Sequence, residues 1–326
     1  MDSFLFAVGA VAPIIITVAV GYFLKRLGLL PAPLAVQLNK ISFRILIPCM
    51  LFLNVYNIQD MGELQLGYIL YALALTTLFF LAIIPISGLL TKERTRRGVI
   101  AQCAFRSNYA LIGIPLVETV YGPTGVAYAA LLSAVLIPVF NIFAVIVLSL
   151  FGNGGKRPTV KSVLIGILKN PFIISIFAGL LVLLLRMGFV SWNIDFRLTD
   201  IAPLYKVLSW FSSAATPIAL LALGAQFEFS AIRSLRREIT ASVLIRAAAV
   251  PLVGLGTALL FCDFNGAQYA ALVALFATPV ATSSAPMAQE MGGDGELAGQ
   301  LVVFTTIASA FTMFLAIYAL RLLGVF

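Results

Sequence analysis

Histidine is absent from this sequence, cysteine is scarce, and charged side chains are few. Asp, Glu, Lys and Arg together make up 10% of the 326 residues, whereas a soluble domain carries about 25%. So little charge cannot cover the surface of a water-soluble domain, but it suits a surface that faces lipid. Hydrophobic residues make up 61% of the chain, and its mean hydropathy is +1.07. The composition therefore predicts an integral membrane protein folded as one compact bundle.

These absences also exclude most kinds of active site. Without histidine, the chain lacks the usual zinc-ligand sets and any Ser–His or Cys–His nucleophile pair. Cys49, Cys103 and Cys262 lie far apart in apolar runs, which is typical of small buried residues. No Walker A motif is present to bind ATP. We therefore expect no enzyme activity, no metal site and no cofactor, apart from sodium or a proton as a coupling ion.

Apolar stretches of about 20 residues are long enough to cross a bilayer as helices. The first stretch is too long for a signal peptide, and Lys25 and Arg26 follow it rather than precede it. The sequence thus predicts an all-α protein with ten transmembrane helices. The ten stretches lie at roughly 4–24, 34–55, 66–89, 98–120, 124–151, 171–190, 204–226, 238–261, 266–288 and 296–324.

The basic residues gather in every second connection, after spans one, three, five and seven. Connections on the cytoplasmic side of a membrane are enriched in Lys and Arg. This pattern predicts a multi-pass protein of the cell inner (plasma) membrane with both termini outside the cytoplasm. It also accounts for the net charge of +8 without nucleic acid as a partner. The residues concerned are Lys25, Arg26, Lys92, Arg94, Arg96, Arg97, Lys156, Arg157, Lys161, Lys169, Arg233, Arg236 and Arg237.

Prolines recur at matching places in the two halves. Pro48 in span two and Pro217 in span seven form one pair, and Pro115 in span four and Pro279 in span nine form another with nearly the same separation along the chain. A half of five spans would insert upside down relative to its copy, giving a 5+5 inverted repeat. Helices four and nine would then be broken near the bilayer midplane, although simple proline kinks are the alternative.

The halves meet at the basic connection near 152–170. We therefore place the first inverted repeat at 1–155 and the second at 156–326. Broken helices leave backbone N–H and C=O groups without helical partners, so these groups can bind a solute or an ion. Polar side chains near the breaks are the natural site candidates.

Span four holds Gln102, Arg106 and Asn108 just ahead of the expected break at Gly113, Ile114 and Pro115. An Arg at the centre of a membrane helix costs about 2.5–3.5 kcal/mol. Arg106 is therefore either a partner for an anion or close enough to the cytoplasmic end to reach water. The amide of Asn108 suits a carboxylate or a cation, but it can also bond a neighbouring helix.

Span nine supplies small and hydroxylated residues, which either line a site or let helices approach closely. Glu290 at its end is the best placed acid for cation or proton coupling, unless it belongs to a solvated helix end. Asn141 and Arg246 are further buried polar candidates. The residues around the expected break are Thr278, Pro279, Val280, Ala281, Thr282 and Ser283.

Several motifs over almost the whole chain carry a family likeness. They are Asn39-Lys40-Ile41 and Leu46-Ile47-Pro48, Asn108 through Leu116, Thr216-Pro217-Ile218-Ala219 with Leu223-Gly224-Ala225, and Ala277 through Ala281 with Ala288-Gln289-Glu290 and Asp294. With these motifs the sequence resembles the auxin efflux carrier family, which includes plant PIN-type carriers and bacterial malonate or malate permease-like proteins. The short connection near 152–170 resembles that of the bacterial members.

The resemblance implies a fold like that of bile-acid symporters and sodium–proton antiporters. Spans one, two, six and seven would form a scaffold, and spans three to five and eight to ten a mobile core with crossing helices four and nine. It implies an elevator-type transporter of small organic anions such as malonate, malate or auxin-like acids, often a homodimer in the lipid bilayer. Asn108 would hold the substrate carboxylate, with Pro115 and Pro279 at the crossing.

Two other membrane functions remain open at this stage. A bile-acid-type sodium symporter or a cation–proton antiporter would share the fold, but an antiporter is expected to place paired acids beside the breaks. If the carrier is coupled to an ion, Gln102, Ser283 and Glu290 are the candidates for binding sodium or a proton. A uniporter driven by the membrane potential would fit equally well.

Overall fold

The computed structural model describes residues 2–57, 66–152, 161, 165, 168–191, 197–227 and 233–325, and these residues are all-helical apart from turns and one isolated bridge. The expected boundary between the halves, with Lys156 and Arg157, lies outside them. The helices are α1 (Asp2–Arg26), α2 (Ala32–Ile41), η1 (Ser42–Leu46), α3 (Ile47–Tyr56), α4 (Leu66–Leu90), α5 (Arg94–Phe105), η2 (Tyr109–Gly113), α6 (Ile114–Phe151), α8 (Pro171–Ser191), η3 (Leu198–Asp200), α9 (Ala202–Gln226), α11 (Arg236–Leu244), η4 (Ile245–Ala249), α12 (Val250–Phe261), α13 (Gly266–Ala277), α14 (Ser284–Glu290) and α15 (Gly295–Leu322).

Long apolar helices dominate the described chain, which confirms the prediction of a helical membrane protein. Seven of them are long and apolar enough to cross a bilayer, and α13 is a shorter apolar helix. The expected fourth and ninth spans are divided into α5, η2 and the start of α6, and into α13 and α14. The seven lie at Ala32–Tyr56, Leu66–Leu90, Thr124–Phe151, Pro171–Phe189, Ala202–Gln226, Arg236–Phe261 and Gly295–Leu322.

Three prolines follow π-helical turns. Pro48, Pro115 and Pro251 are each the second residue of an α-helix that directly continues η1, η2 or η4. Proline has no N–H to donate, and its ring clashes with the carbonyl four residues earlier in a regular α-helix. A π-helical turn widens the helix at that point and relieves the clash. The helix therefore widens just before each of these prolines but does not end there.

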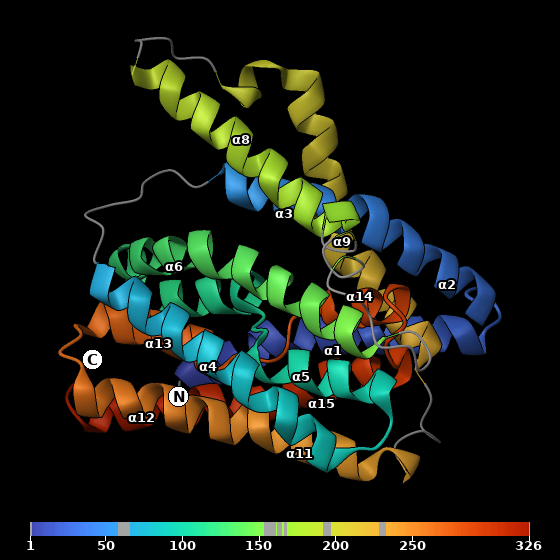
Figure 1. Ribbon diagram of the computed structural model, residues 1–326. Helices are drawn as coiled ribbons and strands as arrows, with labels where there is room; N and C mark the ends of the chain where they lie inside the picture. Colours follow the sequence, from blue (N-terminus) through green and yellow to red (C-terminus); the bar gives the residue numbers. More distant parts are fainter. Residues whose placement is uncertain are drawn as a thin grey trace.

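The helices pack in two groups that α1 joins, because it contacts α9 of one group and α15 of the other; Figure 1 shows α8 above α4, α6 and α11. In one group, α9 packs against α1, α2 and α3, and α8 packs against α3. In the other, α5 packs against α4 and α6, α6 against α13, and α15 against α11, α13 and α14. Glycine permits the closest approach in the first group, because a Cβ on Gly224 would overlap the carbonyl of Val18 in α1.

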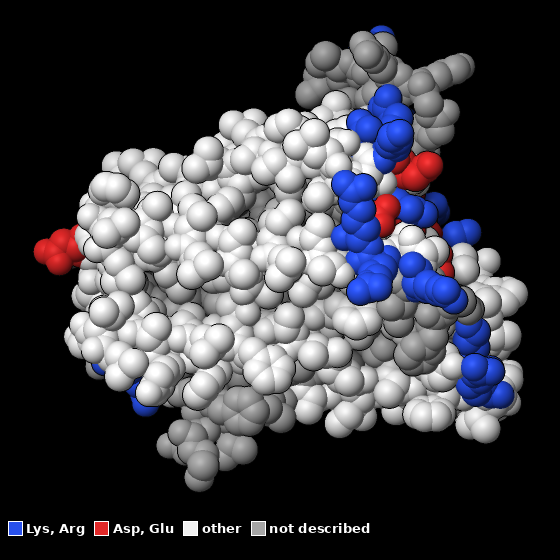
Figure 2. All heavy atoms as spheres, turned by 90° about the horizontal axis from the view of Figure 1, so that it is seen from below, with Lys and Arg blue, Asp and Glu red and all other residues white. Residues whose placement is uncertain are grey.

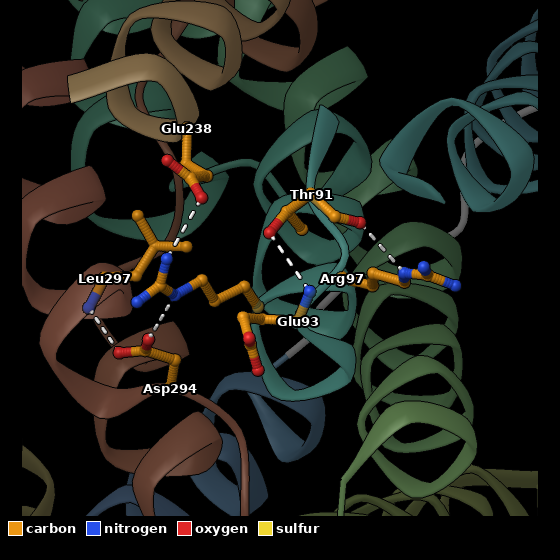
Figure 3. A network of polar contacts seen from close by, with 7 residues as sticks. Thr91, Glu93, Arg97, Glu238, Asp294 and Leu297 are labelled. Carbon is orange, nitrogen blue, oxygen red and sulfur yellow. Dashed lines mark hydrogen bonds and ion pairs between the residues drawn. The ribbon is translucent and has the colours of Figure 1, made fainter. Parts of the chain in front are cut away.

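Lys and Arg side chains gather at one end of the molecule (Figure 2), the end at which α5 and α11 begin in Figure 1. There Arg96 of α5 binds Glu238 of α11 at 3.1 Å and Asp294 at 3.0 Å (Figure 3). Asp294 also caps α15 by accepting the N–H of Leu297 at 2.9 Å. Burial lowers the pKa of Arg96, but its hydrogen bonds to Asp294 and Glu238 outweigh this, so its pKa is raised and it stays charged. This network fixes three helix ends together.

Candidate functional site

Two interrupted helices meet inside the protein. Helix α5 ends at Phe105, and the chain is extended at Arg106 before η2 begins. Helix α13 ends at Ala277, and an extended segment with a turn leads to α14. The two non-helical segments pair as an antiparallel bridge between Ser107 and Val280. Each segment thereby supplies hydrogen bonds that the other has lost by leaving its helix.

Backbone bonds define this pairing. The N–H of Asn108 donates to the carbonyl of Pro279 at 2.8 Å, and the N–H of Ala281 donates to the carbonyl of Arg106 at 3.2 Å. The hydroxyls of Ser107 and Thr278, one from each segment, lie 2.6 Å apart. The predicted residues Arg106, Asn108 and Thr278 through Thr282 are all buried here.

The position of the first interruption differs from the predicted one. The chain leaves the helix at Arg106 through Asn108, and Pro115 lies further along, exposed at the start of α6. The expected break at Gly113, Ile114 and Pro115 was therefore wrong, because the π-helical turn η2 accommodates the proline. Pro279, in contrast, lies within the second extended segment. The two prolines occupy different structural places despite their similar positions in the two halves.

Gly113 and Ile114 have packing environments of different kinds. Gly113 is buried at the end of η2, where a Cβ would lie 3.2 Å from the Cβ of Ala274 in α13. Its small size lets η2 pack closely on α13. Ile114 is half-buried.

Arg106 is buried in a cage of polar side chains. Its side chain is 2% exposed, so the guanidinium does not reach water. It donates to Oδ1 of Asn141 at 2.9 Å, to Oγ of Ser283 at 2.8 Å and to Oε1 of Gln102 at 3.3 Å, and it contacts Sδ of Met287 at 3.1 Å. None of the ion pairs in the described chain involves this arginine. Its positive charge therefore has neutral partners only.

Asn108 lies two residues further along, between the bridge residue Ser107 and η2. Its side chain is 4% exposed, and Nδ2 has no hydrogen-bond partner within the described chain. A buried donor without a partner costs about 1–3 kcal/mol, so this N–H is available to a bound group.

Arg246 of η4 binds at the same two interrupted helices. It is 1% exposed, and it donates to three backbone carbonyls, those of Thr278 at 2.8 Å, Ala104 at 3.1 Å and Leu275 at 3.2 Å. Sequence reasoning ranked Arg246 and Asn141 among the weaker candidates, but both contact residues of the interruptions. Their signal was a polar side chain in an otherwise apolar span.

The three candidates for ion coupling are placed differently. Gln102 donates from Nε2 to the carbonyl of Ser284 at 3.1 Å and, like Ser283, holds Arg106. Glu290 is half-buried at the far end of α14, about 9 Å along the helix from its first residue. Gln102 and Ser283 therefore belong to the interruption, whereas Glu290 does not. No group of three or more metal-ligating residues occurs in the described ranges.

A separate cavity of about 290 Å³ lies between α2, α9, α14 and α15. A chain of amides runs along it: Asn39 donates to Gln289, and Gln289 donates to Oε1 of Gln226 at 2.6 Å. Because these residues come from three helices, the amides connect the two helix groups. Sequence reasoning missed Gln226, whose only signal was an amide at the end of a long apolar span.

Comparisons with known proteins indicate membrane transport. A family model described as membrane transport protein matches residues 6–317. An uncharacterized transporter of Methanothermobacter thermautotrophicus is 24% identical over 92% of this chain and 93% of its own length. A protein of Rhizobium meliloti, provisionally described as a malonate transporter, is 25% identical over 96% of this chain and 95% of its own length.

Proposed function

Because the chain belongs to the membrane transport protein family of auxin efflux carriers, we propose that it is a secondary transporter of small organic anions. One observation carries this proposal above the others. Arg106 is buried at the meeting of two interrupted helices with neutral partners only, and Asn108, two residues along the chain, has a donor without a partner in the described chain. A positive charge and a free N–H in one dry place fit a carboxylate.

Physical chemistry favours an anion at this site. A buried charge without a counter-charge is costly inside a membrane, and a bound carboxylate would supply the missing negative charge. Guanidinium groups bind carboxylates with two parallel hydrogen bonds, and the amide of Asn108 can add a third. Thr278, Pro279, Val280, Ala281 and Thr282 would form the opposite wall. Malonate, malate and auxin-like acids are the proposed class, and the relative provisionally described as a malonate transporter supports it.

We propose an elevator-type alternating-access mechanism for this carrier. Ten transmembrane segments would form a 5+5 inverted repeat, with a scaffold of α1, α2–α3, α8 and α9, and a transport core of α4–α6 and α11–α15. The packing of α3 against α8 and α9, and of α6 against α5 and α13, supports the division, and α1 contacts both groups through α9 and α15. Pro85 inside α4 and Pro251 in α12 add a further matching pair of prolines. Their separation along the chain is close to that between Pro48 and Pro217, as a repeat requires.

The proposed setting is the cell inner membrane. The end that gathers Lys and Arg (Figure 2) would face the cytoplasm, with both termini outside. A homodimer in the bilayer belongs to the same proposal through the family resemblance. A bile-acid-type sodium symporter or a cation–proton antiporter is the alternative. The latter is disfavoured because the polar contacts described at the interruptions involve amides, hydroxyls and arginines but no carboxylates.

The test is thermal stabilisation of the purified protein by mono- and dicarboxylates, with and without sodium. A ligand that binds the folded state raises the melting temperature by mass action. We expect one carboxylate class to stabilise the protein, and Asn108→Ala to remove most of that effect. Arg96→Gln, altered at the far end of α5, is the matched control and should keep it. Failure of every carboxylate to stabilise the wild type would refute the organic-anion proposal.

A further inference from the structure

Arg246 occupies an unusual position for a charged residue. It lies in the π-helical turn η4, just ahead of Pro251, and its side chain is 1% exposed. A π-helical turn displaces side chains from the regular helical spacing and is frequent at functional sites. Here the guanidinium is directed into the meeting of the two interrupted helices, where it contacts α5 and α13 together.

The atoms that Arg246 binds are backbone carbonyls that interrupted helices leave open. The last four carbonyls of a helix have no partner within it. Ala104 belongs to the last turn of α5, Leu275 belongs to the last turn of α13, and Thr278 follows α13 directly. All three carbonyl oxygens lie 2.8–3.2 Å from nitrogen atoms of one guanidinium. In membrane carriers with broken helices, such converging carbonyls coordinate a coupling cation.

The charge of Arg246 is balanced by helix ends without an external ion. Each helix C-terminus carries roughly −0.5 of an elementary charge, so the ends of α5 and α13 together match one guanidinium. Arg246 makes no ion pair within the described chain, and all three of its hydrogen bonds go to these carbonyls. An additional cation would meet a fixed positive charge and find its oxygen ligands already in use.

We propose that Arg246 is a built-in cation that replaces a coupling sodium ion at the interrupted helices. The binding of the organic anion is then independent of sodium, a consequence that rests on the proposed function. A second consequence does not rest on it: shortening Arg246 opens a carbonyl-lined site that takes a small cation from solution.

The experiment measures the melting temperature of the purified full-length protein without any carboxylate. Arg246→Ala should melt well below the wild type, and millimolar guanidinium or methylguanidinium should restore at least half of the loss with saturation. Sodium should restore a smaller part, and choline, which is too large, should restore none. The melting temperatures of the wild type and of Arg96→Ala should not change when these cations are added. Arg96 binds side-chain carboxylates at the membrane edge and no main-chain carbonyls of the interrupted helices.

Two results would overturn the proposal. One is a folded Arg246→Ala protein whose melting temperature ignores guanidinium, methylguanidinium and sodium alike. The other is a wild type that sodium itself stabilises, or whose carboxylate affinity rises more than threefold when sodium replaces choline. This second measurement needs no variant, so it decides the matter if Arg246→Ala does not fold. Should no carboxylate bind at all, the proposed function fails, while guanidinium rescue still tests Arg246.

Discussion

The two buried arginines have similar burial but different partners. Arg246 binds three carbonyl oxygens of the main chain. Arg106 binds two side-chain amide oxygens, one hydroxyl and one thioether sulfur. Main-chain atoms of packed helices cannot move without moving the helices, whereas side chains can rotate to new rotamers. The contrast indicates that Arg246 holds the interrupted helices in place and that Arg106 is able to exchange its partners for a ligand.

The largest expected difference lies in stability. We expect Arg246→Met to lower the free energy of unfolding by more than about 3 kcal/mol, because it leaves three buried carbonyls unsatisfied at about 1–3 kcal/mol each. Arg106→Met should cost no more than about 1–2 kcal/mol, since it also removes a buried charge that lacks a counter-charge. Denaturant titration in detergent measures both. Equal losses would mean that stability does not depend on whether a buried arginine binds main-chain or side-chain atoms.

Ligand affinity should show the opposite order. We expect Arg106→Gln to weaken carboxylate binding by about tenfold to a hundredfold, because a hydrogen bond to a charged group contributes about 1.5–3 kcal/mol. Titration calorimetry with the carboxylate that stabilises the wild type measures the dissociation constant. Arg96→Gln is the matched control, and its affinity should stay within about twofold. A weaker effect at Arg106 than at Arg96 would remove Arg106 from the site.

The apolar pattern of the sequence was sufficient to predict a helical membrane protein, and seven of the long helices bear this out. Pattern reasoning could not locate the first interruption, because it took Pro115 as the breaking residue. Whether a proline ends a helix depends on whether the preceding turn can widen, and η2 does so here. The actual exit at Arg106 depends on a bridge between Ser107 and Val280, which lies in the other half of the chain. Such a contact leaves no local signal.

The polar residues of the candidate site were partly predictable for a similar reason. Arg106, Asn108 and Thr278 stood out because polar groups are rare inside apolar spans. Arg246 and Asn141 carried the same signal, but their partners on other helices could not be inferred from spacing. Glu290 was a candidate for coupling because of its charge, with a solvated helix end as the preferred interpretation, and α14 carries it away from the interruption. Burial and direction of a side chain are properties of the packed bundle, not of one helix.

The smallest expected effect concerns the exchange of partners at Arg106. If a carboxylate displaces the hydroxyl of Ser283, which Arg106 now binds at 2.8 Å, removing that hydroxyl should free a donor for the ligand. We therefore expect Ser283→Ala to tighten carboxylate binding by about twofold to fivefold, corresponding to roughly 0.5–1 kcal/mol.

The matched control for Ser283→Ala is Ser175→Ala in α8. That hydroxyl is also buried and donates to the carbonyl of Phe172 at 2.9 Å, so its loss should leave the affinity unchanged. Isothermal titration of both variants against the same ligand compares them directly. Weaker binding in Ser283→Ala alone would mean that the hydroxyl orients the guanidinium for the ligand instead of competing with it. Arg106 would then be as fixed as Arg246, and the distinction between the two arginines would rest on their accessibility to the ligand rather than on the mobility of their partners.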